Sequence, residues 1–262
     1  MATTQTALIT GASTGIGAVY ADRLALRGHN LVLVARSGEK LAVLAAELHS
    51  KYGVQVETMS ADLANAAQLA RVARRLADDE KITMLVNNAG LGATAKLAES
   101  DIDQMDAMID INVKALTRLT HAVAPRFGNA GSGTIINIAS IVAVAPEVLN
   151  GVYGGSKAFV LALTQSLHHE LGGKGVRVQA VLPGAIETPF WDKAGVPVQH
   201  LPNQIVMKVD DLVDAALSGL DQWEVVTIPS LPDAGEWDRF NAARLAMGPN
   251  LSRNEPAARY RA

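Results

Sequence analysis

The chain of 262 residues contains no cysteine. This absence excludes disulfide bonds, thiolate metal sites and a cysteine nucleophile. The six histidines do not cluster at the spacing of metal ligands, so we expect no metal site. A chain without cysteine is compatible with a reducing compartment, and we expect a cytoplasmic protein.

Aromatic residues, basic charge and long apolar runs are also scarce. Only 4% of the residues are aromatic and 49% are hydrophobic; much of the apolar content is Ala, Val, Leu and Ile, which suits packed helices and buried strands. With 23 basic and 26 acidic residues the net charge is −3, so we expect no nucleic-acid partner. No apolar run reaches the ~18 residues of a membrane helix, and "MATTQTALITGAS" lacks the features of a secretory signal, so we expect no membrane partner.

Short runs rich in β-branched residues alternate with longer amphipathic runs. Most of the short runs are continuously apolar, as in strands that are buried on both faces of a parallel sheet. The alternation predicts an α/β fold with a doubly wound parallel sheet and helices on both faces. The predicted strands are residues 6–10, 31–35, 54–59, 84–87, 133–140, 176–182 and 224–229, and the predicted helices are about 16–27, 38–51, 66–78, 101–127 and 152–171.

The sequence contains no linker rich in Pro, Gly or Ser and no internal repeat. We therefore expect a single domain over residues 1–262, with its ligand crevice at the carboxyl ends of the strands. We expect a substrate loop at about 185–205. The C-terminal tail, about 248–262, has an irregular pattern, and we expect it to wrap over the body or over a neighbouring subunit.

Three glycines follow the first predicted strand and open the first helix, in "TGASTGIG". Gly11, Gly15 and Gly17 have the spacing G-x-x-x-G-x-G. Glycine permits a tight turn and close approach of the backbone to a pyrophosphate, and the helix N-terminus offers free N–H groups. The loop predicts a dinucleotide site, and a merely structural turn is the alternative.

The end of the second predicted strand indicates which dinucleotide is bound. An acidic residue there binds the ribose 2′-OH of NAD, whereas an arginine accommodates the 2′-phosphate of NADP. Here Ala35 stands where the acid is expected, and Arg36 and Ser37 follow. A guanidinium and a hydroxyl suit a phosphate dianion, so we expect NADP(H) rather than NAD(H). An ordinary exposed arginine is the alternative.

Four motifs, taken in order, resemble the short-chain dehydrogenase/reductase family. They are "TGASTGIG" (10–17), "NNAG" (87–90), Ser140 and "YGGSK" (153–157). The resemblance covers roughly residues 5–190 and points to the compact, single-domain branch. It implies a Rossmann-type sheet of about seven strands and an oxidoreductase.

The resemblance also implies which residues contact the cofactor. Each assignment has a structural alternative: a helix cap for Asp62 and Thr188, a plain turn for "NNAG", and a strand terminator for Pro183-Gly184. Asp62 and Leu63 are expected beside the adenine, and Ile186 and Thr188 beside the nicotinamide carboxamide. The expected cofactor-binding residues are Gly11, Ser13, Thr14, Gly15, Ile16, Gly17, Arg36, Ser37, Asp62, Leu63, Asn87, Asn88, Ala89, Gly90, Tyr153, Lys157, Pro183, Gly184, Ile186 and Thr188.

Hydride transfer to a carbonyl needs a proton for the developing alkoxide, and Tyr153 is the candidate acid and base. Lys157 lies four residues on, on the same helix face, and we expect its ammonium to lower the pKa of the phenol. Ser140 ends the fifth strand, where its hydroxyl can hold the substrate oxygen. By resemblance Asn112 completes the catalytic set by positioning a water against Lys157; a solvated helix residue is the alternative.

The expected pocket lining is mostly apolar, which favours a neutral ketone, aldehyde or secondary alcohol. The loops concerned are 91–92, 141–150 and 185–205. The helices at 101–127 and 152–171 are apolar on more than one face, and the resemblance implies that such helices pair between subunits. We therefore expect a homodimer or homotetramer, with a monomer as the alternative. Two other functions stay open: an NAD(H)-dependent alcohol dehydrogenase, and a dinucleotide-binding regulatory protein without turnover.

Overall fold

The computed structural model of the protein describes residues 5–261. The chain divides into two compact units, Met1–Pro229 and Ser230–Ala262. Two such units are compatible with one folding domain or with two, so the single domain over 1–262 stays a prediction. Within the described residues, no helix combines the length and the apolar character that crossing a membrane requires.

The larger unit is built on a seven-stranded sheet in which every pair of neighbours is parallel. This confirms the predicted Rossmann-type, doubly wound sheet. The strand order is β3-β2-β1-β4-β5-β6-β9, so the order reverses between β1 and β4, where such sheets bind their ligands. The strands are β1 (Thr6–Thr10), β2 (Asn30–Ala35), β3 (Val56–Ser60), β4 (Ile82–Asn87), β5 (Thr134–Ile138), β6 (Arg177–Val181) and β9 (Val226–Thr227), with a separate pair β7 (Ala185–Ile186) and β8 (Val206–Met207).

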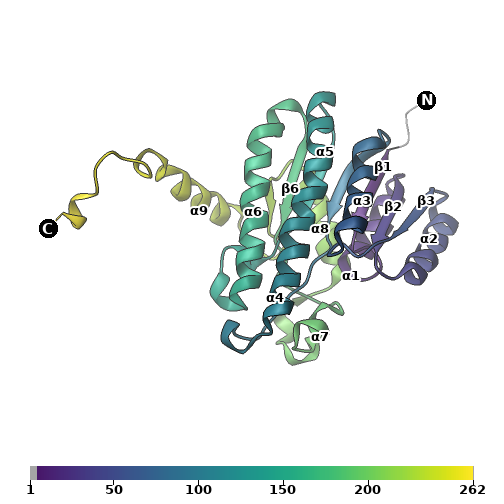
Figure 1. Ribbon diagram of the computed structural model, residues 1–262, viewed down its shortest axis with the longest axis horizontal. Coiled ribbons are helices and arrows are strands. Elements are labelled where there is room, and N and C mark those ends of the chain that lie inside the picture. The colour runs from purple at the N-terminus through teal and green to yellow at the C-terminus, as the bar shows by residue number, and fades with distance from the viewer. Residues whose placement is uncertain (1–4, 262) are drawn as a thin grey trace. The chain divides into compact units, whose positions relative to one another are not determined.

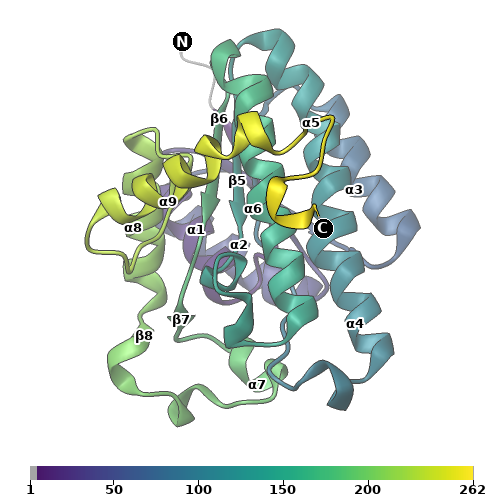
Figure 2. The same cartoon turned by 90° about the vertical axis from the view of Figure 1, so that its left-hand side faces the viewer.

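Helices cover both faces of the sheet because successive strand residues point to opposite faces. Leu31 and Leu33 of β2 pack into one core together with α1, α2 and α8, whereas Val32 and Val34 pack into the other with α3, α5 and α6. Figures 1 and 2 show α4, α5 and α6 side by side. The helices are α1 (Gly15–Leu26), α2 (Gly38–Tyr52), α3 (Ala66–Asp78), α4 (Ile102–Ile109), α5 (Leu116–Ala130), α6 (Gly151–Leu171), α7 (Phe190–Ala194) and α8 (Val209–Asp221).

The helix predicted over 101–127 differs from the observed one in its middle. Between α4 and α5 the chain forms a π-helical segment, Asp110–Ala115. Segments of this kind often occur at functional sites, and this one contains the buried Asn112. Asp101 caps α4 by accepting from the N–H of Asp103 at 3.0 Å.

The smaller unit contains helix α9 (Ala234–Ala246), which the sequence pattern did not predict. Asp233 caps it by accepting from the N–H of Gly235 at 2.9 Å. The rings of Trp237 and Phe240 lie 5.4 Å apart on this helix. The predicted irregular tail holds two short 3₁₀ turns, Gly248–Asn250 and Ala258–Tyr260.

Helix α8 was also missed, and its attachment to α1 is long-range. The guanidinium of Arg23 contacts Asp210 at 2.6 Å and Asp214 at 2.7 Å on α8, and Asp22 at 2.7 Å on its own helix. Hydrogen bonding to Asp214 raises the pKa of Arg23. One turn later, Arg27 pairs with Asp221 at 2.9 Å.

Replacing Arg23 by Gln is expected to lower the free energy of unfolding by about 1–2 kcal/mol, because three carboxylates lose a shared, partly buried partner. At roughly 2–4 °C per kcal/mol, the melting temperature falls by several degrees in low salt. Arg27→Gln is the matched control, since it removes one exposed pair and should cost less than about 1 kcal/mol. Equal melting temperatures for the two variants would contradict the assigned role of Arg23.

Candidate functional site

The loop between β1 and α1 has the backbone that a phosphate cradle requires. Gly11 and Gly15 have φ values of +65° and +58°, a conformation that disfavours a side chain. Gly17 needs to be bare for another reason, because a Cβ there would overlap the carbonyl of Gly11 and the amide of Asn88. The loop is therefore closed and tightly packed.

Helix α1 begins without a side-chain cap. Its N-cap, Thr14, is extended and accepts no N–H, and no acidic residue lies in the first turn. This turn follows β1, one of the two strands between which the strand order reverses. Residues of this kind fit a pyrophosphate, because the helix end is positive and its donors are free.

The loop after β4 is joined directly to the glycine loop. Asn88 Nδ2 donates to the carbonyls of Thr10 (2.9 Å) and Gly11 (3.1 Å). The N–H groups of Asn88 and Ala89 both donate to Thr10 Oγ1 at 3.0 Å. The structure thus brings "TGASTGIG" and "NNAG" together, although they are about 75 residues apart. It assigns Thr10, which the sequence analysis did not single out, as the link.

Asn87 lies elsewhere. Its side chain is buried in the core, where Nδ2 donates to Thr120 Oγ1 (3.0 Å) and Asn137 Oδ1 (2.9 Å). Asn137 in turn donates to Thr164 Oγ1 on α6 at 2.9 Å. Strand alternation turns this side chain into the core below the site, so the expected contact of Asn87 with the cofactor stays a prediction that only its backbone could fulfil.

Arg36 and Ser37 come directly after β2, as predicted. Arg36 is exposed, and its side chain has no hydrogen bond or ion pair within residues 5–261. Ser37 is the N-cap of α2 and accepts from the N–H of Lys40 at 3.4 Å. A free guanidinium beside a helix N-terminus suits a phosphate dianion.

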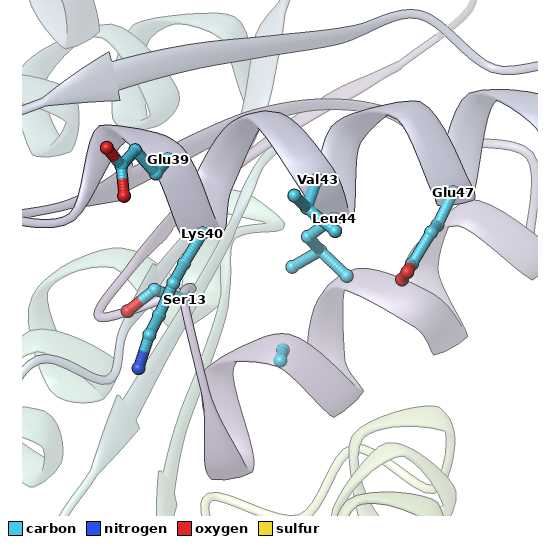
Figure 3. A pocket seen from close by; sticks show the side chains of 7 residues that line it. Ser13, Glu39, Lys40, Val43, Leu44 and Glu47 are labelled. Atoms are coloured by element: carbon cyan, nitrogen blue, oxygen red, sulfur yellow. The ribbon is translucent and has the colours of Figure 1, made fainter.

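A cavity of about 440 Å³ lies between α1 and α2 next to these residues (Figure 3). Lys40 extends alongside Ser13 at one end of it, so a second cation is close to the glycine loop. Lys40 was not predicted, although a basic residue one turn after Arg36 is a readable signal. The lining residues are Ser13, Ala18, Glu39, Lys40, Val43, Leu44 and Glu47.

Asp62 and Leu63 follow β3 and serve local structure. The Asp62 carboxylate accepts from the N–H of Ala64 at 3.0 Å, and Leu63 is buried in a core. Asn65, rather than Asp62, caps α3. A contact of Asp62 or Leu63 with adenine stays a prediction.

Tyr153 and Lys157 lie in the first two turns of α6, which Asn150 caps by accepting from the N–H groups of Val152 and Tyr153. The two glycines of "YGGSK" differ. A Cβ on Gly154 would come within 3.1 Å of Pro146, whereas nothing lies within 4 Å of one on Gly155. The close approach of Pro146 therefore favours a glycine at position 154, whereas the space around position 155 would admit a side chain.

Three side chains converge at the end of β5. Burial raises the pKa of Tyr153 to about 12, and hydrogen bonding with Ser140 acts in the opposite direction. Lys157 is buried, donates to the carbonyl of Ile138 at 2.9 Å, and has its pKa lowered to about 8 by desolvation. Its Nζ lies 5.9 Å from the centroid of the Tyr153 ring, and the expected lowering of the Tyr153 pKa by this ammonium stays a prediction.

Asn112 joins the π-helical segment to this cluster. Its Oδ1 accepts from the N–H of Leu91 at 2.8 Å, and Nδ2 donates to Leu91 O (2.9 Å) and Ser156 Oγ (3.0 Å). A Cβ on Gly90 would lie 3.1 Å from Asn112 Oδ1 and 3.5 Å from Lys157 Nζ. Asn112 thus positions the loop beside Lys157; a water held between the two stays a prediction.

The segment after β6 faces the glycine loop. A Cβ on Gly15 would contact Thr188 Cγ2 at 3.3 Å. The Pro183 carbonyl accepts from the N–H of Ile141 at 3.0 Å and from Ser140 Oγ at 3.4 Å, which holds Ser140 against this segment. Thr188 does not cap α7, whose N-cap is Pro189. Gly184 and Ile186 lie in the same segment, and their contacts with a nicotinamide stay predictions.

The whole arrangement is a dinucleotide cradle that ends at a buried phenol, a hydroxyl and an amine. A neutral phenol can donate a proton, the hydroxyl can bind an oxygen, and the amine can carry positive charge. Around the phenol lie Leu91, Val142, Leu149 and Phe190, all apolar. Such a site suits proton transfer to or from the oxygen of a small neutral molecule.

Comparison with known proteins agrees with this chemistry. Residues 5–196 match the sequence model of the family described as short chain dehydrogenase. A solved structure of a short-chain dehydrogenase from Sphingobium yanoikuyae in complex with NADPH is 49% identical; the match covers 98% of this chain and 100% of that one, with a TM-score of 0.95.

Two further relatives are characterised. The bulky-bulky ketone specific alcohol dehydrogenase of Comamonas testosteroni is 44% identical over 98% of this chain and 99% of its own, with a TM-score of 0.90. Sulfoacetaldehyde reductase 2 of Chromohalobacter salexigens is 41% identical over 70% of this chain and 73% of its own. The chain therefore belongs to the short-chain dehydrogenase/reductase family of oxidoreductases.

Proposed function

We propose that the protein transfers a hydride between NADP(H) and a neutral, apolar carbonyl compound or the corresponding secondary alcohol. The observation that carries this proposal is the convergence of Ser140, Tyr153 and Lys157 at the end of the dinucleotide cradle. The cofactor, when bound, supplies or accepts the hydride. The residues of this chain hold the cofactor and manage the proton.

Tyr153 is the acid in carbonyl reduction. Because burial raises the pKa of its phenol to about 12, the group is protonated throughout the neutral range and can donate to a developing alkoxide. Ser140 holds the same oxygen, and its own place is fixed by the Pro183 carbonyl. Lys157, when protonated, stabilises the phenolate that remains.

The cofactor preference rests on the end of β2. The Arg36 guanidinium forms no hydrogen bond or ion pair within the described residues. Lys40 and Ser13 line the cavity next to it. Two cations and a hydroxyl suit the 2′-phosphate of NADP. The relative from Sphingobium yanoikuyae was solved with NADPH, which supports the same preference.

The substrate class follows from the lining. Among the described side chains, those of the cluster that packs around Tyr153 are apolar, which favours a substrate with apolar substituents over a small sulfonate such as sulfoacetaldehyde. A ketone like those of the Comamonas testosteroni relative is the better fit. A regulator without turnover would need none of the converged acid–base groups.

We also propose that the protein is a cytoplasmic homodimer or homotetramer that uses α4 and α6 for assembly. Ile102, Ile109 and Phe159 on these helices are 65%, 44% and 38% exposed. Exposed apolar side chains of this size on neighbouring helices are typical of an oligomer interface. Size-exclusion chromatography with light scattering would measure the mass, and a monomer would contradict this proposal.

Tyr153→Phe is expected to lower kcat for ketone reduction with NADPH by at least ~10²-fold, because the proton donor is lost and the ring is kept. NADPH affinity, measured by quenching of protein fluorescence, should change less than about threefold. Turnover of the ketones by the unaltered protein should also be measured with NADH in place of NADPH. Near-normal turnover of the variant would contradict the mechanism.

Arg36→Asp is expected to raise the Kd for NADPH at least ~10-fold, since a carboxylate replaces the partner of a phosphate dianion, and to improve binding of NADH. Lys40→Ala should weaken NADPH binding less and leave NADH binding unchanged. Calorimetric titration of each variant with both cofactors gives the four constants. An unchanged NADPH-to-NADH ratio in the Arg36 variant would refute the preference assigned here.

Lys157→Met should stabilise the cofactor-free protein while abolishing turnover. The pKa of Lys157 falls from 10.5 to about 8, so below pH 8 both folded and unfolded states are protonated and the full desolvation penalty applies. After loss of the hydrogen bond to Ile138, about 2 kcal/mol of gain remains at pH 7.

The gain should shrink between pH 8 and 10.5, because there the folded wild-type protein releases its proton first. Denaturant unfolding at pH 7 and 9.5 measures it. A variant less stable than the wild type at pH 7 would contradict the assigned penalty.

A further inference from the structure

Three of the protein's few aromatic rings form a row in which Phe190 lies between Tyr153 and Trp191. The whole chain has only 4 Phe, 4 Tyr and 3 Trp. The centroid of the Phe190 ring lies 5.9 Å from that of Tyr153, at an interplanar angle of 43°. The Trp191 ring lies 5.7 Å from Phe190 in an edge arrangement. In a chain so poor in aromatics, such a cluster at the reacting group calls for a specific reason.

The Phe190 ring packs against Tyr153. Only 6% of Tyr153 is exposed. Phe190 is half-buried, at the start of α7, and packs with Tyr153 in a small apolar cluster separate from the two main cores. A carbonyl that reaches the phenol therefore brings one of its substituents against the Phe190 ring.

Gly92 makes this position of the ring possible. A Cβ on residue 92 would overlap Phe190 Cζ and lie 2.7 Å from Cε2. The backbone of Gly92 is not in the left-handed region, so its conformation makes no demand for glycine. The Phe190 ring leaves no room for a side chain at residue 92, so the loop after β4 accommodates the ring by having glycine there.

Helix α7 is held at both ends, so the ring is fixed. Trp191 Nε1 donates to the Ile186 carbonyl at 2.9 Å. At the other end, Thr94 Oγ1 donates to the Ala194 carbonyl at 2.7 Å, and the Thr94 N–H donates to the same oxygen at 3.2 Å. Thr94 and Gly92 belong to one loop, which therefore anchors the helix and seats its aromatic residue.

We infer that Phe190, seated against Gly92, recognises an aromatic substituent on the substrate carbonyl, so that the preferred substrates are aryl ketones and the corresponding benzylic alcohols. Aromatic rings pair in offset or edge geometries with a stabilisation that exceeds that of area burial alone. A fixed ring beside the phenol offers such a face at the point where hydride transfer occurs. This inference rests on the proposed function, because it names the substrate class of the same site.

The test compares two ketones that differ in one substituent, cyclohexyl phenyl ketone and dicyclohexyl ketone, with NADPH. The unaltered protein should show the higher kcat/KM for the phenyl ketone. Phe190→Leu keeps an apolar side chain but removes the ring, and it should lower the phenyl-to-dicyclohexyl ratio of kcat/KM by ~3- to 10-fold. Phe190→Tyr should keep the ratio within about twofold, and so should Phe159→Ala, a control on α6 outside the cluster.

The seat of the ring is tested by a double-mutant cycle. Gly92→Ala should lower the same ratio in the wild-type background, because the added methyl displaces the ring. In the Phe190→Ala background it should have no further effect, since nothing is left to displace. Melting temperatures of the four proteins give a readout that does not depend on turnover, and Gly92→Ala should lower the melting temperature only when Phe190 is present.

The outcomes distinguish a failure of the role of Phe190 from a failure of the proposed oxidoreductase activity. A ratio unchanged in Phe190→Leu, or no aryl preference in the unaltered protein, overturns the role of Phe190 and leaves the oxidoreductase intact. If Gly92→Ala and Phe190→Ala change the kcat/KM ratio and the melting temperature additively, the claim that Gly92 makes room for the Phe190 ring is wrong. Absence of turnover with every ketone tried overturns the proposed function, and this inference with it.

Discussion

The buried ammonium of Lys157 is the constraint on which the rest of the site depends. Burying a charge is expensive unless acceptors are supplied, and the described residues supply one, the Ile138 carbonyl. The surroundings are arranged to leave room beside it: Gly90 is bare, and Asn112 holds the loop that carries Gly90. An amine with a pKa near 8 stays able to gain and lose a proton close to neutrality, which a solvated lysine would not do.

The position of this amine is set by polar contacts that fix α6 against the sheet. Asn137 on β5 donates to Thr164 on α6, and Asn87 on β4 donates to Asn137, all inside the core. At the other end of the helix, Ser156 accepts from Asn112. Hydrogen bonds between buried groups are directional, so they specify the register of a helix in a way that apolar packing alone does not. The face of α6 that carries Tyr153 and Lys157 is thereby held at the carboxyl end of β5.

The sequence was informative where the chemistry is local. Seven parallel strands follow from continuous apolar runs, and the glycine loop, "NNAG" and "YGGSK" follow from short motifs. Long-range contacts could not be predicted in this way. Helix α8 is attached by ion pairs between Arg23 and residues about 190 positions away, and the burial that raises the pKa of Tyr153 depends on Phe190 and Val142.

Asn87 and Lys40 show two limits of assignment by motif. Asn87 was assigned by its motif, but the alternation of β4 turns its side chain into the core. Lys40 belongs to no motif, and only the packing of α2 beside α1 brings it next to Ser13. Motifs identify residues by type and spacing, whereas the side a residue faces is decided by the element that carries it.

The glycines of the site are of two kinds: some are required by the backbone conformation, and others by a neighbouring group that comes close. Gly11 and Gly15 are bare because their backbone is left-handed, which is a demand of the turn itself. Gly17, Gly92 and Gly154 have ordinary backbones and are bare because another group approaches: a carbonyl, the Phe190 ring and Pro146. Gly155 meets neither condition. Glycines of the first kind shape the loop that suits a phosphate. Glycines of the second kind lie where a neighbouring group comes close to the backbone, and at residue 92 that group is an aromatic ring packed against Tyr153.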